Sequence, residues 1–209
     1  MEIAVDHDYN LRLAKPMSRK EIEHFARYAR KEFGVKGLYV DIMKILEVII
    51  PADDEDFHFE IYKVTDFLGP KPAYYDSEKN CIFIREDIYN NAIAGDGYAR
   101  FTIAHEIGHY CLISVFGNPG YISIEEIENY SDPKLRSMDP EWQTDVFAGE
   151  FLCCSEVIKD LTWKEIQAKC VVTEAAARTA WKIVNEVPYS ISENKSMYSV
   201  RYNYYVSNF

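Results

Sequence analysis

The stretch "ARFTIAHEIGHYCLI", residues 99–113, contains two histidines four positions apart, with a glutamate directly after the first. Asp96 is a good N-cap before this stretch and Gly117 a good terminator after it, so the sequence predicts a helix from about Gly97 to Val115. This helix either presents a metal site or buries two histidines in an apolar environment. Other parts of the sequence are needed to decide between these two interpretations.

His105 and His109 share one face of the predicted helix, because positions i and i+4 are about one turn apart. Two imidazole nitrogens can therefore reach one metal ion. Glu106 lies one step round the helix, where it can reach a water beside that ion without binding the ion. The H-E-x-x-H spacing is typical of zinc peptidases and predicts a Zn²⁺ site with Glu106 as its base.

A third protein ligand is needed, because a catalytic zinc is tetrahedral and keeps one position for water. The extended motif that takes a third histidine from the same helix is excluded, since Leu112 and Val115 occupy the positions of its glycine and histidine. Glu141 is the best candidate for this ligand. It lies in the first turn of a later helix, which Asp139 is expected to cap and Pro140 to open.

Asp145 follows Glu141 at i+4 and shares its helix face, so it is expected to accept a hydrogen bond from the second nitrogen of a ligand histidine. Glu141 can also be explained without a metal, as a first-turn acid that the helix dipole favours. Other acidic residues are alternative ligands: Glu125, Glu126, Glu128 and Glu150.

The composition predicts one cytoplasmic domain over residues 1–209. With 48% apolar and 27% charged residues, the chain has an ordinary globular composition. Its 23 basic and 34 acidic residues give a net charge of −11, which disfavours nucleic acid as a direct partner. We find no signal peptide and no apolar run long enough to cross a membrane. The five cysteines lack a C-x-x-C spacing, so neither disulfides nor a thiolate zinc site is expected.

The pattern along the chain predicts an α+β fold, mainly helical, with a small antiparallel sheet near the motif helix. The expected segments are N-terminal helices at 18–50, capped by Ser18 and ended by Pro51, the sheet at 57–84, and zinc-binding helices at 97–152. Between the two zinc-binding helices lies a long connection, 117–138, with one acidic helical turn. A helical tail at 155–187 and a possible strand at 196–209 complete the chain.

Residues Arg100–Tyr110 and Glu141–Leu152 together resemble the ImmA/IrrE family of metallopeptidases. The family pattern joins R-F-T-x-A-H-E-x-G-H to a downstream E-x-x-A-[ND]-x-F-A-A-x-L-[LM]. This chain departs from it at Thr144 and Gly149, which replace alanines, and at Cys153-Cys154, where Met-Pro is common. None of the departures affects a proposed ligand.

The resemblance implies a zincin-like fold with His105, His109 and Glu141 as Zn²⁺ ligands and Glu106 as the general acid and base. It also implies a cytoplasmic protease that cleaves a helix-turn-helix repressor of a mobile element or a stress response. The oxyanion of the reaction needs a further donor, and several residues are candidates: Tyr98, Tyr110, Tyr121, Tyr130 and His58. An extended peptide is expected to pair with an edge strand, for which residues 57–64 are the first candidate.

Two other functions are alternatives. One is a non-catalytic, zinc-stabilised module that sequesters a transcription regulator. The other is DNA binding by the tail, where Thr173 would cap a recognition helix, although Gln167 and Val171 do not suit such a motif and the charges of the tail balance. The sequence does not identify the substrate, its cleavage site or the oligomeric state.

Overall fold

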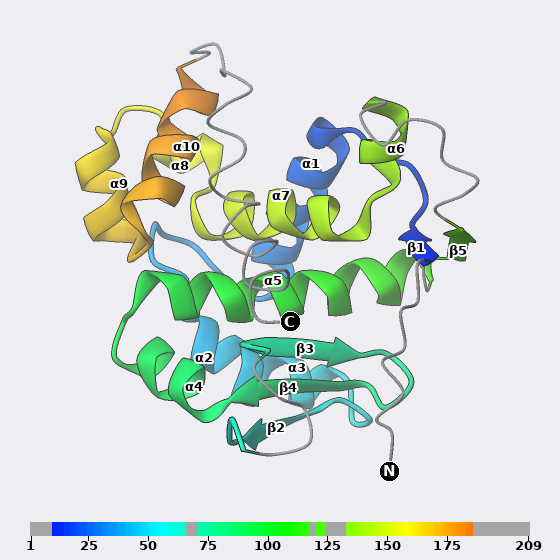
Figure 1. The fold of residues 1–209 in the computed structure, drawn as a ribbon. Helices are drawn as coiled ribbons and strands as arrows, with labels where there is room; N and C mark the ends of the chain where they lie inside the picture. The colour runs from blue at the N-terminus through cyan, green and yellow to red at the C-terminus, as the bar shows by residue number, and fades with distance from the viewer. Residues whose placement is uncertain (1–9, 66–70, 118–119, 124–132, 186–209) are drawn as a thin grey trace.

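Helix α5 (Gly97–Phe116) carries the H-E-x-x-H motif and runs through the middle of the computed structural model, which describes residues 10–65, 71–117, 120–123 and 133–185 (Figure 1). The other described helices are α1 (Arg19–Glu32), α2 (Ile42–Lys44), the π-helical turn η1 (Ile45–Ile49), α3 (Ile50–Asp53), α4 (Glu86–Ile93), α6 (Pro133–Met138), α7 (Pro140–Leu152), α8 (Ser155–Ile158), α9 (Trp163–Cys170) and α10 (Glu174–Val184). The described strands are β1 (Asn10–Leu13), β2 (His58–Tyr62), β3 (Ala73–Asp76), β4 (Cys81–Arg85) and β5 (Gly120–Ser123). Mainly helical with a small sheet, the fold is α+β as predicted.

Helix α5 is covered on one side by α7 and α1 and on the other by the sheet of β2, β3 and β4 (Figure 1). Gly108 allows α5 and α7 to approach closely. A Cβ at this position would lie 2.7 Å from Thr144 Cγ2 and 2.9 Å from Phe147 Cδ1, which is closer than side-chain atoms pack. The close approach brings the histidine face of α5 against the first turns of α7.

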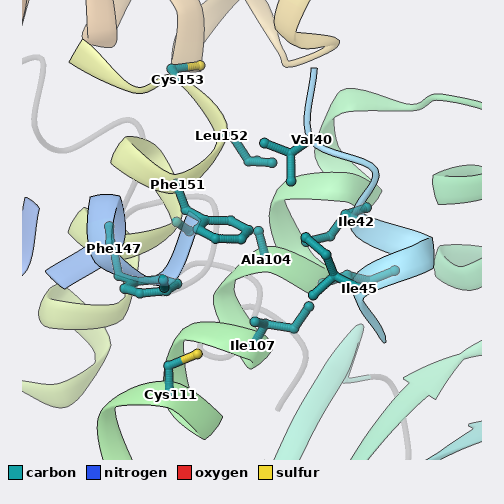
Figure 2. Packing of buried hydrophobic residues seen from close by; sticks show 14 of the residues in the cluster. Val40, Ile42, Ile45, Ala104, Ile107, Cys111, Phe147, Phe151, Leu152 and Cys153 are labelled. Carbon is teal, nitrogen blue, oxygen red and sulfur yellow. The ribbon is translucent and has the colours of Figure 1, made fainter. Parts of the chain in front are cut away.

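Apolar side chains from three segments form the core around this contact (Figure 2). Ala104 and Ile107 of α5 lie between Phe147 and Phe151 of α7 and Ile42 of α2 with Ile45 of η1. All of these residues are buried, so the motif helix is fixed on several sides. A rigid core around α5 is what a site built on this helix requires.

The three-stranded sheet is mixed, so the prediction of an antiparallel sheet is wrong in part. Strands β3 and β4 form the predicted antiparallel hairpin, whereas β2 pairs with β4 in parallel, in the order β2-β4-β3. The tight turn between β3 and β4 fixes their antiparallel pairing. Because β4 lies between β2 and β3, these two strands are the edges of the sheet.

The N-terminal helices are confirmed, with one correction. Ser18 and Glu21 form the capping box of α1, as the sequence predicts. Pro51 does not end the second helical segment, which continues to Asp53. The π-helical turn η1 explains the difference: the Ile50 N–H donates to the Ile45 carbonyl, and the changed hydrogen-bond pattern accommodates a proline without an N–H.

Strands β1 and β5 pair as a two-stranded antiparallel sheet that the sequence did not predict, and helices α4 and α6 were also missed. The predicted helical tail is confirmed as α8, α9 and α10. Ser123, the first residue of the expected helical turn at 123–130, ends β5 instead, and the rest of this turn and the expected strand at 196–209 lie outside the described residues. Among the described helices, none combines the length and the apolar character that crossing a bilayer requires.

Candidate metal centre

His105 and His109 of α5 and Glu141 of α7 converge on one point. The two imidazole Nε2 atoms are 3.0 Å apart. Glu141 Oε2 lies 3.2 Å from His105 Nε2, and Glu141 Oε1 lies 3.2 Å from His109 Nε2. The structure therefore brings together the three residues that the sequence singled out as ligands, although Glu141 comes from a different helix than the two histidines.

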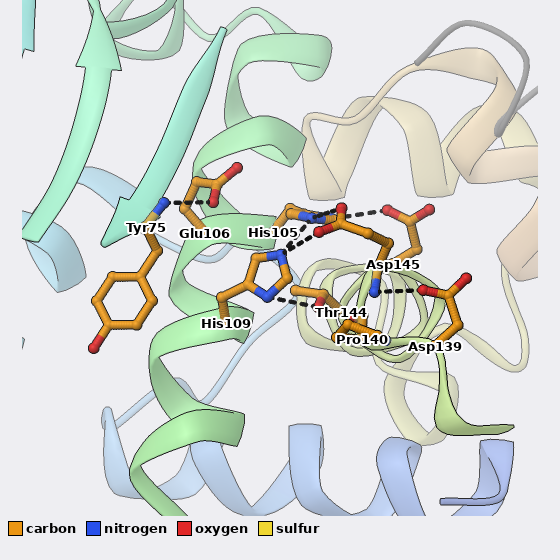
Figure 3. A network of polar contacts seen from close by, with 9 residues as sticks. Tyr75, His105, Glu106, His109, Asp139, Pro140, Thr144 and Asp145 are labelled. Atoms are coloured by element: carbon orange, nitrogen blue, oxygen red, sulfur yellow. Dashed lines mark hydrogen bonds and ion pairs between the residues drawn. The ribbon is translucent and has the colours of Figure 1, made fainter. Parts of the chain in front are cut away.

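Asp145 fixes the tautomer of His105, as predicted. Its Oδ1 lies 2.8 Å from His105 Nδ1 (Figure 3). A carboxylate can only accept, so Nδ1 carries the proton and donates it. In the neutral ring, Nε2 then has a lone pair that points at His109 and Glu141. A carboxylate behind a histidine is the usual support of a metal ligand.

Thr144 supports His109 in the same way. Its hydroxyl donates to the Pro140 carbonyl one turn earlier, and its Oγ1 lies 3.2 Å from His109 Nδ1 (Figure 3). Because the hydroxyl proton is already engaged, Oγ1 accepts from His109 Nδ1. The Nε2 atom of His109 therefore also has a lone pair directed at the centre.

The donor set fits a tetrahedral cation such as Zn²⁺. Two neutral nitrogens and a carboxylate put only lone pairs at the centre, and such a group is electrostatically unfavourable without a positive charge between its members. Ligands of a tetrahedral zinc at ~2.0–2.1 Å are about 3.3 Å apart. The observed separations of 3.0–3.2 Å are close to this spacing.

Glu141 is ionised and held in position by its own helix. Desolvation at the site raises the pKa of this carboxyl, but positive charge on His109 and His105 and hydrogen bonds from their rings, when these are protonated, lower it by more, so the pKa lies well below its ordinary value. A cation bound between neutral rings would supply the same positive charge. The side chain is nevertheless 63% exposed, so the carboxylate closes the centre at its solvent side. Asp139 caps α7 by accepting from the Glu141 N–H at 2.9 Å, and Pro140 opens the helix, as predicted.

Glu106 lies on the side of α5 that faces the sheet, next to His109 but turned away from α7 (Figure 3). It is buried, and its Oε2 accepts from the backbone N–H of Tyr75 at 3.1 Å. No further strand of the sheet lies on the other side of β3, so a side chain can bind this N–H there. The contact fixes the carboxylate in one orientation and joins the edge of the sheet to the motif helix.

A cavity of about 290 Å³ opens beside the centre. Glu106, His109 and Glu141 line it, together with Thr144 and the β3 residues Ala73 to Tyr75. Its far wall combines apolar residues at the end of α5 with two lysines at the rim: Leu112, Ile113, Phe116, Lys15 and Lys71. The proposed base and two of the three ligand residues thus face one space large enough for part of a peptide.

Several alternatives from the sequence do not reach this centre. Glu150 binds Arg27 at 2.8 Å and Ser155, so it is not a ligand. The Tyr110 hydroxyl donates to Asp54, at 3.0 Å, and His58 lies on β2 at the other edge of the sheet. Tyr98 is not among the residues that line the cavity. The remaining candidates are not described: Glu125, Glu126, Glu128, Tyr130 and the side chain of Tyr121.

Two functional contacts were missed by the sequence analysis. Thr144 was treated as a departure from a family pattern, whereas its position three residues after Glu141 could have suggested a place on the ligand face. The Tyr75 N–H that binds Glu106 is a backbone group, so no residue type signals it.

Comparison with known proteins does not identify the chain. No protein-family model matches it, and neither does any curated protein. A solved structure of a Mycobacterium tuberculosis transcriptional regulator is similar over 75% of this chain, with 16% identity and a TM-score of 0.47. The chain spans 44% of the length of that protein. Similarity of this extent establishes neither a shared fold nor a shared function.

Proposed function

We propose that this protein is a zinc-dependent peptidase with a zincin-like arrangement, related to the ImmA/IrrE metallopeptidases. The observation that carries the proposal is the convergence of two imidazole lone pairs and a carboxylate at 3.0–3.2 Å, each histidine supported from behind, beside a buried glutamate in an open cavity. A pair of histidines that merely fills a core also needs hydrogen-bond partners, but it does not need both Nε2 atoms to converge with a carboxylate beside a cavity.

The residues of the chain have distinct roles in the proposed hydrolysis. A Zn²⁺ ion at His105, His109 and Glu141 supplies a Lewis acid that favours ionisation of water and polarises the scissile carbonyl. Glu106 accepts the proton of the attacking water and then transfers it to the leaving nitrogen, so that one carboxylate acts as base and as acid. The Tyr75 N–H holds Glu106 on the cavity side of α5 during both transfers.

Strand β3 is the edge that we propose for the peptide, in place of the segment 57–64 favoured from the sequence. β2 is also an edge strand, but β4 and β3 separate it from α5. β3 contacts α5 and lines the cavity, so an extended peptide beside it runs past Glu106 and Glu141. The main-chain groups of β3 would provide affinity, and the cavity would receive one substrate side chain.

The proposed substrate is a regulatory protein, in particular a helix-turn-helix repressor in the cytoplasm. The support for this is the resemblance of residues 100–110 and 141–152 to the ImmA/IrrE pattern. The same resemblance suggests a role in the control of a mobile element or a stress response.

The test is cleavage of a peptide library prepared from a soluble proteome, with new N-termini identified by mass spectrometry. The wild-type protein with Zn²⁺ is expected to produce new termini. Glu106→Gln should produce none while it binds the same amount of zinc, because it loses the proton acceptor and keeps the ligands. His105→Ala should lose both zinc and cleavage.

The non-catalytic module remains the second candidate, because no side chain in the described part of the chain is assigned as the oxyanion donor. If wild type and Glu106→Gln both produce no termini and both bind zinc equally, the peptidase proposal is wrong and the binding module is favoured. If Glu106→Gln cleaves as well as wild type, the role assigned to Glu106 is wrong.

A further inference from the structure

A second cluster of metal-binding side chains lies on the outer face of the sheet, away from the centre on α5. His58 and Glu60 are two positions apart on β2 and therefore point to the same face. Cys81 is the registered partner of His58 on β4. One imidazole nitrogen, one carboxylate oxygen and one sulfur lie within 4.8 Å of one another.

The backbone determines this convergence. Strand pairing fixes the positions of His58 and Cys81, and the pleat fixes that of Glu60 relative to His58. His58 Nε2 lies 3.9 Å from Glu60 Oε1. Ligands on one tetrahedral zinc are about 3.3–3.8 Å apart. Because the His58 and Glu60 side chains are half exposed, small rotations of these two are enough to reach that spacing.

His58 also has the support that a metal ligand requires. Its Nδ1 faces the Asp56 carbonyl at 3.4 Å. A carbonyl only accepts, so Nδ1 is the protonated nitrogen and Nε2 has the lone pair on the side of Glu60 and Cys81. The arrangement resembles that of His105, with a main-chain carbonyl in place of Asp145.

The charges around Cys81 favour a cation. Burial and the nearby Glu60 and Asp76 carboxylates raise the pKa of the Cys81 thiol to about 11. The thiol is therefore protonated at neutral pH in the absence of a metal. Lys79 pairs with Asp76 at 3.3 Å and offsets that carboxylate. Glu60 and a Cys81 sulfur deprotonated by metal binding would then supply two negative charges, which a divalent ion compensates.

We propose that His58, Glu60 and Cys81 form a second divalent-metal site for Zn²⁺ or a similar thiolate-binding ion. When the ion binds, the S–H bond of Cys81 breaks, the proton passes to solvent, and the sulfur donates a lone pair to the metal. The site would link the edge strand β2 to the central strand β4. It does not depend on the proposed peptidase activity.

Titration of the metal-free, full-length protein with Co²⁺ tests this inference. A thiolate ligand gives a sulfur-to-cobalt charge-transfer band in the near ultraviolet, whereas the centre at His105 contains no cysteine and gives only visible bands. We expect two equivalents to bind, one for each cluster, with the charge-transfer band assigned to one of them. Failure of this site and failure of the catalytic centre are therefore distinguishable in one spectrum.

Variants test whether the charge-transfer band arises from the cluster of His58, Glu60 and Cys81. Cys81→Ser should abolish the charge-transfer band and keep one equivalent of bound Co²⁺. Cys154→Ser, which changes another buried cysteine, should keep both. His58→Ala and Glu60→Ala change exposed residues and should keep the fold while the affinity for the second equivalent falls by at least about tenfold. The inference is overturned if wild type shows no thiolate band at two equivalents, if the band survives in Cys81→Ser, or if His58→Ala binds as tightly as wild type.

Discussion

Asp145→Ala provides the most informative perturbation of the proposed metal centre, because Asp145 should affect metal affinity without touching the metal. Its carboxylate accepts from His105 Nδ1 at 2.8 Å and is the reason why the His105 Nε2 has its lone pair. Without this acceptor the ring can rotate and can place its proton on either nitrogen. Loss of such a supporting carboxylate reduces metal affinity by about 10–100-fold, or ~1.4–2.7 kcal/mol.

The affinity is measured by competition with a fluorescent zinc chelator at constant pH. Asp145→Asn should lie between wild type and Asp145→Ala, because its amide oxygen still accepts from Nδ1 but carries no full charge. Glu86→Ala is a control matched in charge, since Glu86 is exposed at the start of α4. Circular dichroism checks that all variants fold. A dissociation constant for Asp145→Ala within twofold of that of Glu86→Ala would refute the role of Asp145.

Three further predictions concern neighbouring contacts. Thr144→Val removes the acceptor for His109 Nδ1 and keeps the side-chain shape, so zinc affinity measured with the same chelator should fall by about tenfold or more; an unchanged affinity would contradict the assigned tautomer of His109. Gly108→Ala places a Cβ within 2.7 Å of Thr144 and should lower the free energy of unfolding by about 1–3 kcal/mol in urea denaturation, and unchanged stability would contradict the close helix contact. Tyr110→Phe removes a hydrogen bond to Asp54. The hydrogen bonds that Asp54 accepts from Asn80 and from Tyr110 lower the pKa of this carboxyl by more than desolvation raises it. The lowered pKa stabilises the fold above the unfolded value of 3.8, and this stabilisation is lost as the pH falls through the folded value. Tyr110→Phe should therefore lose about 1 kcal/mol near neutral pH and less in acid; an equal loss at neutral and acidic pH would contradict the contact with an ionised Asp54.

The sequence predicted which side chains of the candidate centre lie together, because local patterns determine most of this arrangement. The i, i+4 spacing of a helix is enough to place His105 beside His109, and Asp139-Pro140 is enough to start the helix that carries Glu141. Asp145 follows Glu141 by the same spacing, so its contact with His105 was foreseeable once the two helices were assumed to meet.

The features that the sequence did not predict depend on distant segments or on the backbone. The parallel pairing of β2 with β4 depends on the order of the strands in the sheet. The alternation of apolar and polar residues within each strand does not determine that order. The continuation of the helix past Pro51 depends on the π-helical turn before it. Glu106 accepts from the backbone N–H of Tyr75. This N–H is available because β3 lies at the edge of the sheet.

Anomalous diffraction at the zinc edge, from crystals grown with Zn²⁺, tests the proposed metal centre most directly. We expect a peak about 2.0–2.2 Å from the Nε2 atoms of His105 and His109 and from a carboxylate oxygen of Glu141. Density that shows no ion between the two histidines, or an ion there with the Glu141 carboxylate turned to solvent, would contradict the proposed metal centre.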